Sequence, residues 1–395
     1  MKIIRQIIAV TVMNLRTLPL RVTPALVSVI GIAGVVLILV ALLSISEGFR
    51  RTLELSGSDR VAIVLRGSSS AELTSSFSQE QVQIIEQAPG IARDSHGPII
   101  SAELYTTVDQ PKRTTGTAAN APFRGVEPAG PLTRAHFQLI AGRMFATGRY
   151  EVIVGRSAAQ TLTGLAVGSV VKWGNNQWHI VGEFTDGGSV SESEIWTDAR
   201  VLQSAYSRGD TFQTVRALLT SADSFKAFKD ALIHDPRVSL TVLTEHEFYA
   251  AQSALLSTVI RGAGTVLGLL MGVGAVFGAL NTMYSAVAAR STEIATLRAL
   301  GFGGLAVAVS VVIEALLLGL IGGAFGALVA YLAFDGLQTS TINYQSFTQV
   351  SFAFSVTPGL IITGTGYALL LALIGGVFPA IYAARRPIIA GLRQA

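Results

Sequence analysis

Residues 22–46 read VTPALVSVIGIAGVVLILVALLSIS and contain no charged side chain. A helix rises ~1.5 Å per residue, so roughly 20 such residues cross a ~30 Å hydrocarbon core. Three further apolar stretches of sufficient length lie within residues 258–289, 305–334 and 356–384. The pattern predicts an α-helical membrane protein with four transmembrane helices, one before and three after a large insert at residues 47–257.

The first apolar stretch is too long for a cleaved signal peptide, whose apolar region has roughly 7 to 15 residues. The sequence ALLSIS that ends it is also a poor cleavage site. We therefore expect residues 22–46 to be retained as the first span.

The composition agrees with a membrane protein. Half of the residues are hydrophobic and 14% are charged, against about a quarter in a typical soluble domain. The net charge of +4 comes from basic residues beside the spans, whereas the insert mixes both signs. A nucleic-acid binder would gather its basic residues on one soluble face, so we expect no nucleic-acid partner.

Basic residues also predict the orientation, because short cytoplasmic segments carry an excess of Lys and Arg. Residues 1–21 contain Lys2, Arg5, Arg16 and Arg21 and no acid. The loop 290–304 and the tail 385–395 are basic as well. We therefore expect the N-terminus, that loop and the C-terminal tail to be cytoplasmic, with the insert 47–257 and a loop at 335–355 on the outer side.

The insert has the patterns of a mixed α+β domain, and without cysteine it carries no disulfide. Strand patterns occur at 61–65, 99–108, 151–154, 169–173 and 177–184, and helix patterns at 79–87, 156–162, 199–206 and 221–234. Gly174 and Asn175 between two strand patterns predict a hairpin. The small polar stretches 68–78 and 111–121 are expected to be exposed loops. Residues 47–55 and 245–260 predict helical stalks that continue the first two spans.

Catalytic motifs are missing from the sequence. It has no phosphate loop, no His-Glu-x-x-His and no Gly-x-Ser-x-Gly,. The histidines lack the spacing of a metal site: His96, His136, His179, His234 and His246. We assign no catalytic residue and no metal ligand, so ATP-driven work requires another polypeptide.

The loop 290–304 predicts a short helix. It has a cap, an acid in the first turn, a base near the last turn and a terminating glycine: Ser291, Glu293, Arg298 and Gly301,. Ile294 and Leu297 share one face and form an apolar ridge. Two interpretations stay open: a ridge that docks into a partner's groove, or a membrane-surface helix whose arginines meet lipid phosphates.

Residues 1–21 predict an interfacial amphipathic helix. Its two faces contrast apolar Ile3, Ile7, Val10 and Leu15 with polar Lys2, Arg5, Asn14 and Arg16. Two interpretations stay open here as well: this helix contacts either a partner protein or membrane lipids.

Small residues four apart let transmembrane helices approach closely. Such glycines occur in the second and third spans: Gly264, Gly268, Gly272, Gly322 and Gly326. They predict packing seams, either within the bundle or with another subunit. Glu314 lies roughly 14 Å into the third span and should face protein or water. Glu314 either makes a structural hydrogen bond or takes part in a proton relay.

Two runs of sequence, RSTEIATLRALGF at 290–302 and VIEALLLGLIGGAFG at 312–326, resemble the FtsX-like permease domain of type VII ABC transporters. That family includes the macrolide exporter MacB and the lipoprotein-releasing permeases. The insert is similar to the family's periplasmic core domain at 123–128, 141–145 and 151–156, which read FRGVEP, AGRMF and EVIVGR.

The resemblance implies a multi-pass permease of the bacterial inner membrane, without enzyme activity or cofactor of its own. ATP and Mg²⁺ would belong to a separate cytoplasmic ABC ATPase dimer. Further implied partners are a second permease copy or paralogue, membrane lipids and an adaptor of the membrane-fusion type. The residues that the resemblance implies in ATPase coupling are Arg290, Glu293, Ile294, Leu297, Arg298 and Gly301.

Two functions follow from the resemblance. The first is export or extraction of a hydrophobic or amphipathic substrate, such as a lipoprotein, lipid, drug or peptide. The second is a transmembrane regulator that activates a cell-wall hydrolase or senses an external ligand. A gene for a fusion-type adaptor beside this one favours the first, and a gene for a hydrolase favours the second.

Overall fold

The structure is a computed structural model that describes residues 2–17, 22–343 and 348–388. The chain divides into two compact units. The helical unit comprises Met1–Glu47, Thr258–Leu337 and Phe354–Ala395, and the sheet unit comprises Gly48–Ser257 and Gln338–Ala353. Residues 18–21 of the predicted N-terminal segment and Arg393 of the predicted tail lie outside the described residues.

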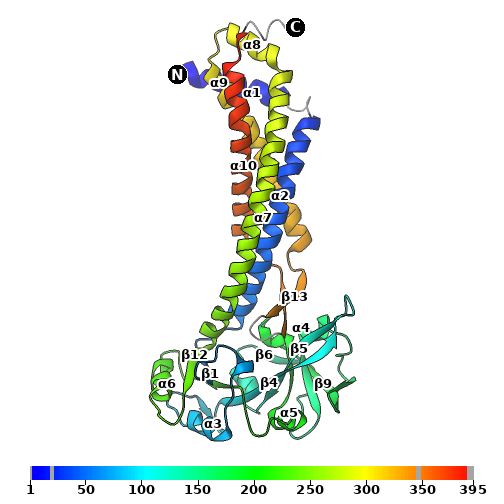
Figure 1. Ribbon diagram of the computed structural model, residues 1–395, viewed down its shortest axis with the longest axis vertical. Helices are drawn as coiled ribbons and strands as arrows, with labels where there is room; N and C mark the ends of the chain where they lie inside the picture. The colour runs from blue at the N-terminus through cyan, green and yellow to red at the C-terminus, as the bar shows by residue number, and fades with distance from the viewer. Residues whose placement is uncertain (1, 18–21, 344–347, 389–395) are drawn as a thin grey trace. The chain divides into compact units, whose positions relative to one another are not determined.

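Within the described residues, four helices are long and apolar enough to cross a membrane. They are α2 (Val22–Leu55), α7 (Glu245–Ala289), α9 (Gly304–Phe334) and α10 (Pro358–Arg385), joined by two shorter helices, α1 (Lys2–Thr17) and α8 (Ser291–Ala299). The four long helices run side by side as a bundle (Figure 1). Helices α2 and α7 are unbroken over the residues predicted as stalks. The predicted fold class, four spans with an α+β insert between the first two, is confirmed.

The predicted glycine seams lie in contacts within the chain. A Cβ atom on Gly326 of α9 would overlap the Ala33 carbonyl oxygen of α2 and lie 2.9 Å from its Cα. On α7, the Gly268 carbonyl accepts a hydrogen bond of 2.8 Å from the Tyr367 hydroxyl of α10. The missing side chain of Gly326 therefore lets α9 approach α2 closely, and a Cβ atom on Gly272 of α7 would likewise overlap the Tyr367 hydroxyl of α10,. Three related contacts are those of Gly264 with Leu42, Gly272 with Tyr367 and Gly322 with Ile32.

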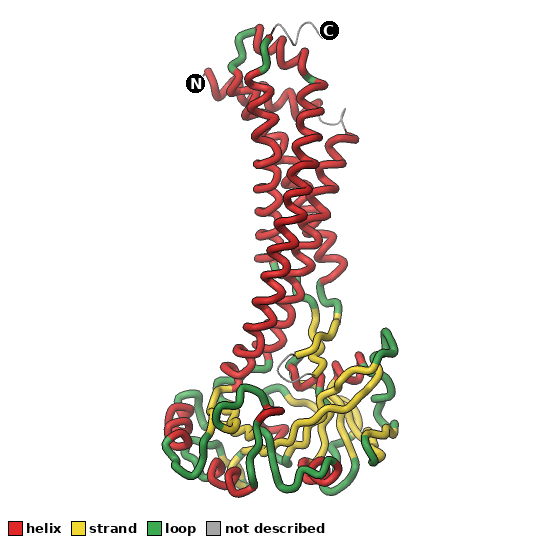
Figure 2. Tube along the Cα trace, in the orientation of Figure 1, coloured by secondary structure: helices red, strands yellow, loops and turns green. Residues whose placement is uncertain are grey.

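The sheet unit is built on a ten-stranded sheet of order β12-β1-β11-β4-β5-β10-β7-β9-β6, with β8 also paired to β9. Figure 2 shows the strands of this unit in yellow. The strands of the ten-stranded sheet are β1 (Val61–Arg66), β4 (Ile100–Pro111), β5 (Ala118–Val126), β6 (Phe137–Gly142), β7 (Glu151–Gly155), β8 (Val170–Trp173), β9 (Asn176–Asp186), β10 (Ile195–Asp198), β11 (Thr214–Leu218) and β12 (Leu240–Thr244). A two-stranded sheet joins β2 (Arg93–Asp94) to β3 (Gly97–Pro98). The helices are α3 (Gln79–Glu86), α4 (Arg156–Thr161), α5 (Ala199–Ala205) and α6 (Ser224–Ile233), with 3-10 helices η2 (Glu72–Thr74), η3 (Gly130–Thr133) and η4 (Val190–Ser193).

The predicted hairpin of the insert is confirmed, because Trp173 of β8 pairs with Asn176 of β9. Gly174 begins the two-residue turn with φ +58°, a conformation that glycine adopts without steric cost. Trp173 and Trp178 of this hairpin are buried against Phe123 in one of the unit's hydrophobic clusters.

Two stretches predicted as exposed loops are partly buried. In 68–78, Glu72 and Phe77 are buried, since Phe77 joins an apolar cluster and Glu72 pairs with an internal arginine. In 111–121, strand β5 already begins at Ala118 and pairs with Pro111. Small Ala and Thr residues resemble a loop in composition, but alternate ones here face the core.

The predicted outer loop at 335–355 is a hairpin of β13 (Gln338–Asn343) and β14 (Thr348–Ala353), and residues 344–347 lie outside the described residues. Its sequence is polar but rich in β-branched side chains, which favour strands. Val350 and Phe352 are buried. By its contacts the hairpin belongs to the sheet unit.

Candidate functional site

Helix α8 connects α7 to α9 and lies at the same end of the helical bundle as α1 (Figure 1). The prediction that Ser291 caps it is wrong. Arg290 is the N-cap residue, and Ser291 is buried as the first helical residue. Gly301 follows the helix with φ +94°, the left-handed conformation typical of a glycine after a helix end.

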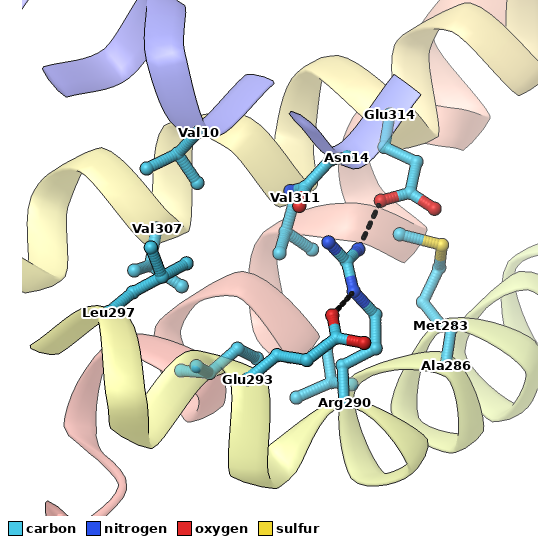
Figure 3. A pocket seen from close by; sticks show the side chains of 12 residues that line it. Val10, Asn14, Met283, Ala286, Arg290, Glu293, Leu297, Val307, Val311 and Glu314 are labelled. Carbon is cyan, nitrogen blue, oxygen red and sulfur yellow. Dashed lines mark hydrogen bonds and ion pairs between the residues drawn. The ribbon is translucent and has the colours of Figure 1, made fainter. Parts of the chain in front are cut away.

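A buried ion pair ties the start of α8 to α9. Arg290 Nη1 donates to Glu314 Oε2 at 3.1 Å, and Arg290 Nε donates to Glu293 Oε2 at 3.3 Å (Figure 3). The side chains of Arg290 and Glu314 are 5% and 8% exposed, whereas that of Glu293 is 49% exposed. Glu314 therefore has a charged structural partner, and Arg290 points into the bundle instead of outward. Ionisable residues within a span usually pair with another polar or charged group. The position of Glu314 in the third span was therefore the sequence signal for a buried partner.

The expected ridge of Ile294 and Leu297 is not formed. Ile294 is 7% exposed and packs in a cluster with Met283, Val307 and Val311. Leu297 is half-buried and lines the same pocket as Arg290 (Figure 3). The apolar side of α8 covers the core of its own bundle, because burying it there removes apolar surface from water.

A different face of α8 is exposed. It carries the Glu293 carboxylate, Thr296 and the apolar Leu300, whose side chain is 73% exposed. Thr296 and Leu300 are four residues apart and so share one side of a helical turn. Leu300 was not among the predicted site residues, although its position four residues after Thr296 and seven after Glu293, one and two helical turns, is visible in the sequence,.

Two side chains, those of Arg298 and Gln6, hold the C-terminal end of α8 and the loop that follows it. Arg298 Nη1 donates to the Arg386 carbonyl oxygen at the end of α10, at 2.6 Å. From α1, the Gln6 side chain donates to the Gly301 carbonyl at 3.3 Å and accepts from the Gly303 amide at 3.4 Å. Helix α8 is thus tied to α9, α10 and α1 at once.

Helix α1 buries Val10 and Asn14. The Asn14 side-chain amide donates to the Ser310 hydroxyl of α9, so its assignment to a polar outer face is wrong. Ile4, Ile8 and Val12 are exposed instead. These three residues form a second apolar stripe, and the interfacial position predicted for residues 1–21 stays a prediction.

The sheet unit holds a buried ionic cluster. Arg124 donates to Glu72, Glu103 and Glu194 at 2.8–2.9 Å, and Arg134 also pairs with Glu103. Burial acts to raise the pKa of Glu103, but the charges of Arg134 and Arg124 outweigh it and hold that pKa at about 2. Burial opposes the charge of Arg124, but its three carboxylate partners raise its pKa. These groups satisfy one another, which suits a structural role better than acid–base chemistry.

Metal ligation has no candidate in the part of the chain that the structure describes, where no group of three or more His, Asp or Glu is placed to hold an ion. Helix α8 presents exposed polar and apolar side chains on one face, and contacts to α9, α10 and α1 hold it in place.

These features define a class of protein, a multi-pass membrane protein with a large α+β domain between its first two spans. Residues 25–234 match the model of the MacB-like periplasmic core domain, and residues 265–388 match that of the FtsX-like permease C-terminal domain. The chain belongs to the family of ABC transporter permeases of the MacB and FtsX type.

Similar proteins include an uncharacterized ABC transporter permease of Methanocaldococcus jannaschii, 21% identical over 91% of each chain. Among solved structures, the extracellular domain of the noncanonic ABC-type transporter YknZ from Gram-positive bacteria is 16% identical, with a TM-score of 0.35, covering 47% of this chain and all of that one. The periplasmic region of MacB from Actinobacillus actinomycetemcomitans is 10% identical, with a TM-score of 0.37, covering 51% of this chain and 95% of that one.

Proposed function

We propose that this chain is a permease subunit that couples ATP hydrolysis by a separate cytoplasmic ATPase dimer to movement of its sheet unit. The movement drives export or extraction of a hydrophobic or amphipathic substrate across or from a bacterial inner membrane. A second copy or paralogue completes the transporter. In this proposal the N-terminus, α8 and the C-terminal tail are cytoplasmic, and the sheet unit faces outward.

The observation that carries the proposal is the attachment of α8. A helix that only lies on the membrane surface needs no specific ties to the spans. Helix α8 has a buried ion pair at its start and a hydrogen bond to the end of α10, and the loop from α8 to α9 makes two hydrogen bonds to Gln6 of α1. A force applied to α8 therefore reaches α9 and α10 directly.

The structure supports a division of roles among the predicted coupling residues. Arg290, Ile294, Arg298 and Gly301 fix α8 to the bundle, because their side chains or backbone face inward. Glu293 is paired with Arg290 but half-exposed, and it lies on the outer face of α8 together with the two added residues Thr296 and Leu300. Leu297 is half-buried and lies between the inward-facing residues and the exposed ones. An exposed leucine beside a carboxylate suits the apolar centre and polar rim of a protein interface.

Affinity purification in mild detergent tests the proposal. We expect an ABC ATPase to co-purify with the wild-type chain and to be lost with Leu300→Asp. The matched control is Leu132→Asp, which changes an exposed leucine of the sheet unit and should leave the ATPase bound. Equal recovery from both variants would contradict docking at α8. Recovery of an adaptor or a cell-wall hydrolase in the same eluate separates export from the regulatory alternative.

A further inference from the structure

The 3-10 helix η4, Val190–Ser193, touches two segments of the sheet unit that continue along the chain into spans. The first is the end of α2. The Val190 backbone amide donates to the Ser56 hydroxyl oxygen at 2.7 Å, and that hydroxyl donates to the Thr52 carbonyl of α2 at 2.8 Å. Both of these bonds are buried. Ser56 thus ties the last turn of α2 to η4.

The second segment is the β13–β14 hairpin, which links α9 to α10. The Ser351 backbone amide of β14 donates to the Ser193 hydroxyl oxygen at 3.0 Å, also in a buried setting. Beside it, the rings of Phe352 and Phe49 meet edge to face with centroids 5.6 Å apart. Phe49 belongs to α2, so η4 and this ring contact bring both segments together within the sheet unit.

Helix η4 is itself firmly held by the sheet. The Glu192 carboxylate accepts from the Asp186 and Gly188 amides at 2.9 and 2.8 Å. A Cβ atom on Gly155 would overlap the Glu192 carbonyl, so the backbone at the end of β7 packs directly on the backbone of η4. Glu194, the residue that follows η4, pairs with Arg124 of the buried ionic cluster at 2.8 Å.

We infer that Ser56 and Ser193 are positioning residues, which clamp the end of α2 and the β13–β14 hairpin to one rigid point of the sheet unit. The inference rests on the proposed function and adds where movement enters the sheet unit. Helix η4 then receives the movement of α2 and also that of the α9–α10 pair, so the sheet is displaced at one place instead of being bent at two.

Hydrogen–deuterium exchange of the full-length chain in detergent tests the clamp without any partner. Ser193→Ala removes the acceptor of the Ser351 amide, so exchange in the β14 peptide should rise about fivefold, the factor expected for one hydrogen bond of ordinary strength. Ser193→Thr keeps a hydroxyl and should restore slow exchange. Ser191→Ala alters a buried serine of the same helix whose hydroxyl is in neither link, and should leave β14 unchanged. Equal exchange in all variants would overturn the clamp.

The same measurement with the co-purified ATPase separates the clamp from the proposed function. In the wild type, ATP binding should change exchange across the sheet unit. Ser56→Ala and Ser193→Ala should reduce that change at least fivefold while lowering the melting temperature of the chain by only a few degrees, as expected for one lost hydrogen bond. A change of the same size in the variants would overturn the positioning role. If the wild type shows no ATP-dependent change while Ser193→Ala still frees β14, the clamp stands and the proposed function fails.

Discussion

Replacing Glu314 with Gln leaves the guanidinium of Arg290 buried without its full counter-charge. Arg290 and Glu314 are 5% and 8% exposed and 3.1 Å apart, and removing one partner of such a pair costs about 3–5 kcal/mol. Glu293 remains within 3.3 Å of Arg290 but is half-exposed, so it compensates only in part. We therefore expect a loss near the lower end, about 3 kcal/mol.

A double-mutant cycle measures this pair directly. Arg290→Met should cost a similar amount, because it leaves the Glu314 carboxylate buried without the guanidinium of Arg290,. The double variant, Arg290→Met with Glu314→Met, should be destabilised by no more than about 1 kcal/mol, since two apolar side chains replace two charges. Thermal unfolding in detergent, followed by helical circular dichroism, reports the three midpoints. Single variants as stable as the wild type, or a double variant that loses the sum of both, would refute the buried pair.

Three further outcomes follow from other parts of the chain. Gly326→Ala should destabilise the protein by about 1–3 kcal/mol, because its Cβ overlaps the α2 backbone,, whereas Gly274→Ala, with open space around it, should be neutral in the same melt. Burial acts to raise the pKa of Glu103, but two guanidinium groups hold it at about 2, below the usual 4.5. The stability this contributes, about 3 kcal/mol, is present above pH 4.5 and lost as the pH falls toward 2; acid titration of Glu103→Gln should lack that loss. Cysteines at exposed Lys172 and Thr296 should react with an impermeant thiol reagent from the outside and from the cytoplasmic side respectively, and labelling of both from one side would reverse the proposed orientation.

The four spans were predictable from the length of their apolar runs, and several elements of the insert from apolar residues at regular spacing. Periodicity failed where a buried charge interrupts the pattern. Strand β11 has Arg216 at its centre, paired with Glu245 at the start of α7. An arginine at that position looks like a turn or surface residue, and its partner is too distant in sequence to be identified.

The candidate site shows the same limit. The helix at 291–299 and its terminating glycine were predictable from local signals. Which side of the helix faces outward was not, because that depends on how α8 packs on α9 and α10. Ile294 is buried by that packing, and Leu300 is exposed by it. The pairing of Arg290 with Glu314 likewise depends on the approach of two helices.

The most direct test of α8 as the ATPase docking element is photocrosslinking in living cells. A photoreactive amino acid at Thr296, exposed on α8, should form a covalent adduct between this chain and an ABC ATPase. The same amino acid at Leu267, exposed within span α7, should form none. Absence of the adduct at Thr296, with the chain inserted and stable, would contradict docking at α8.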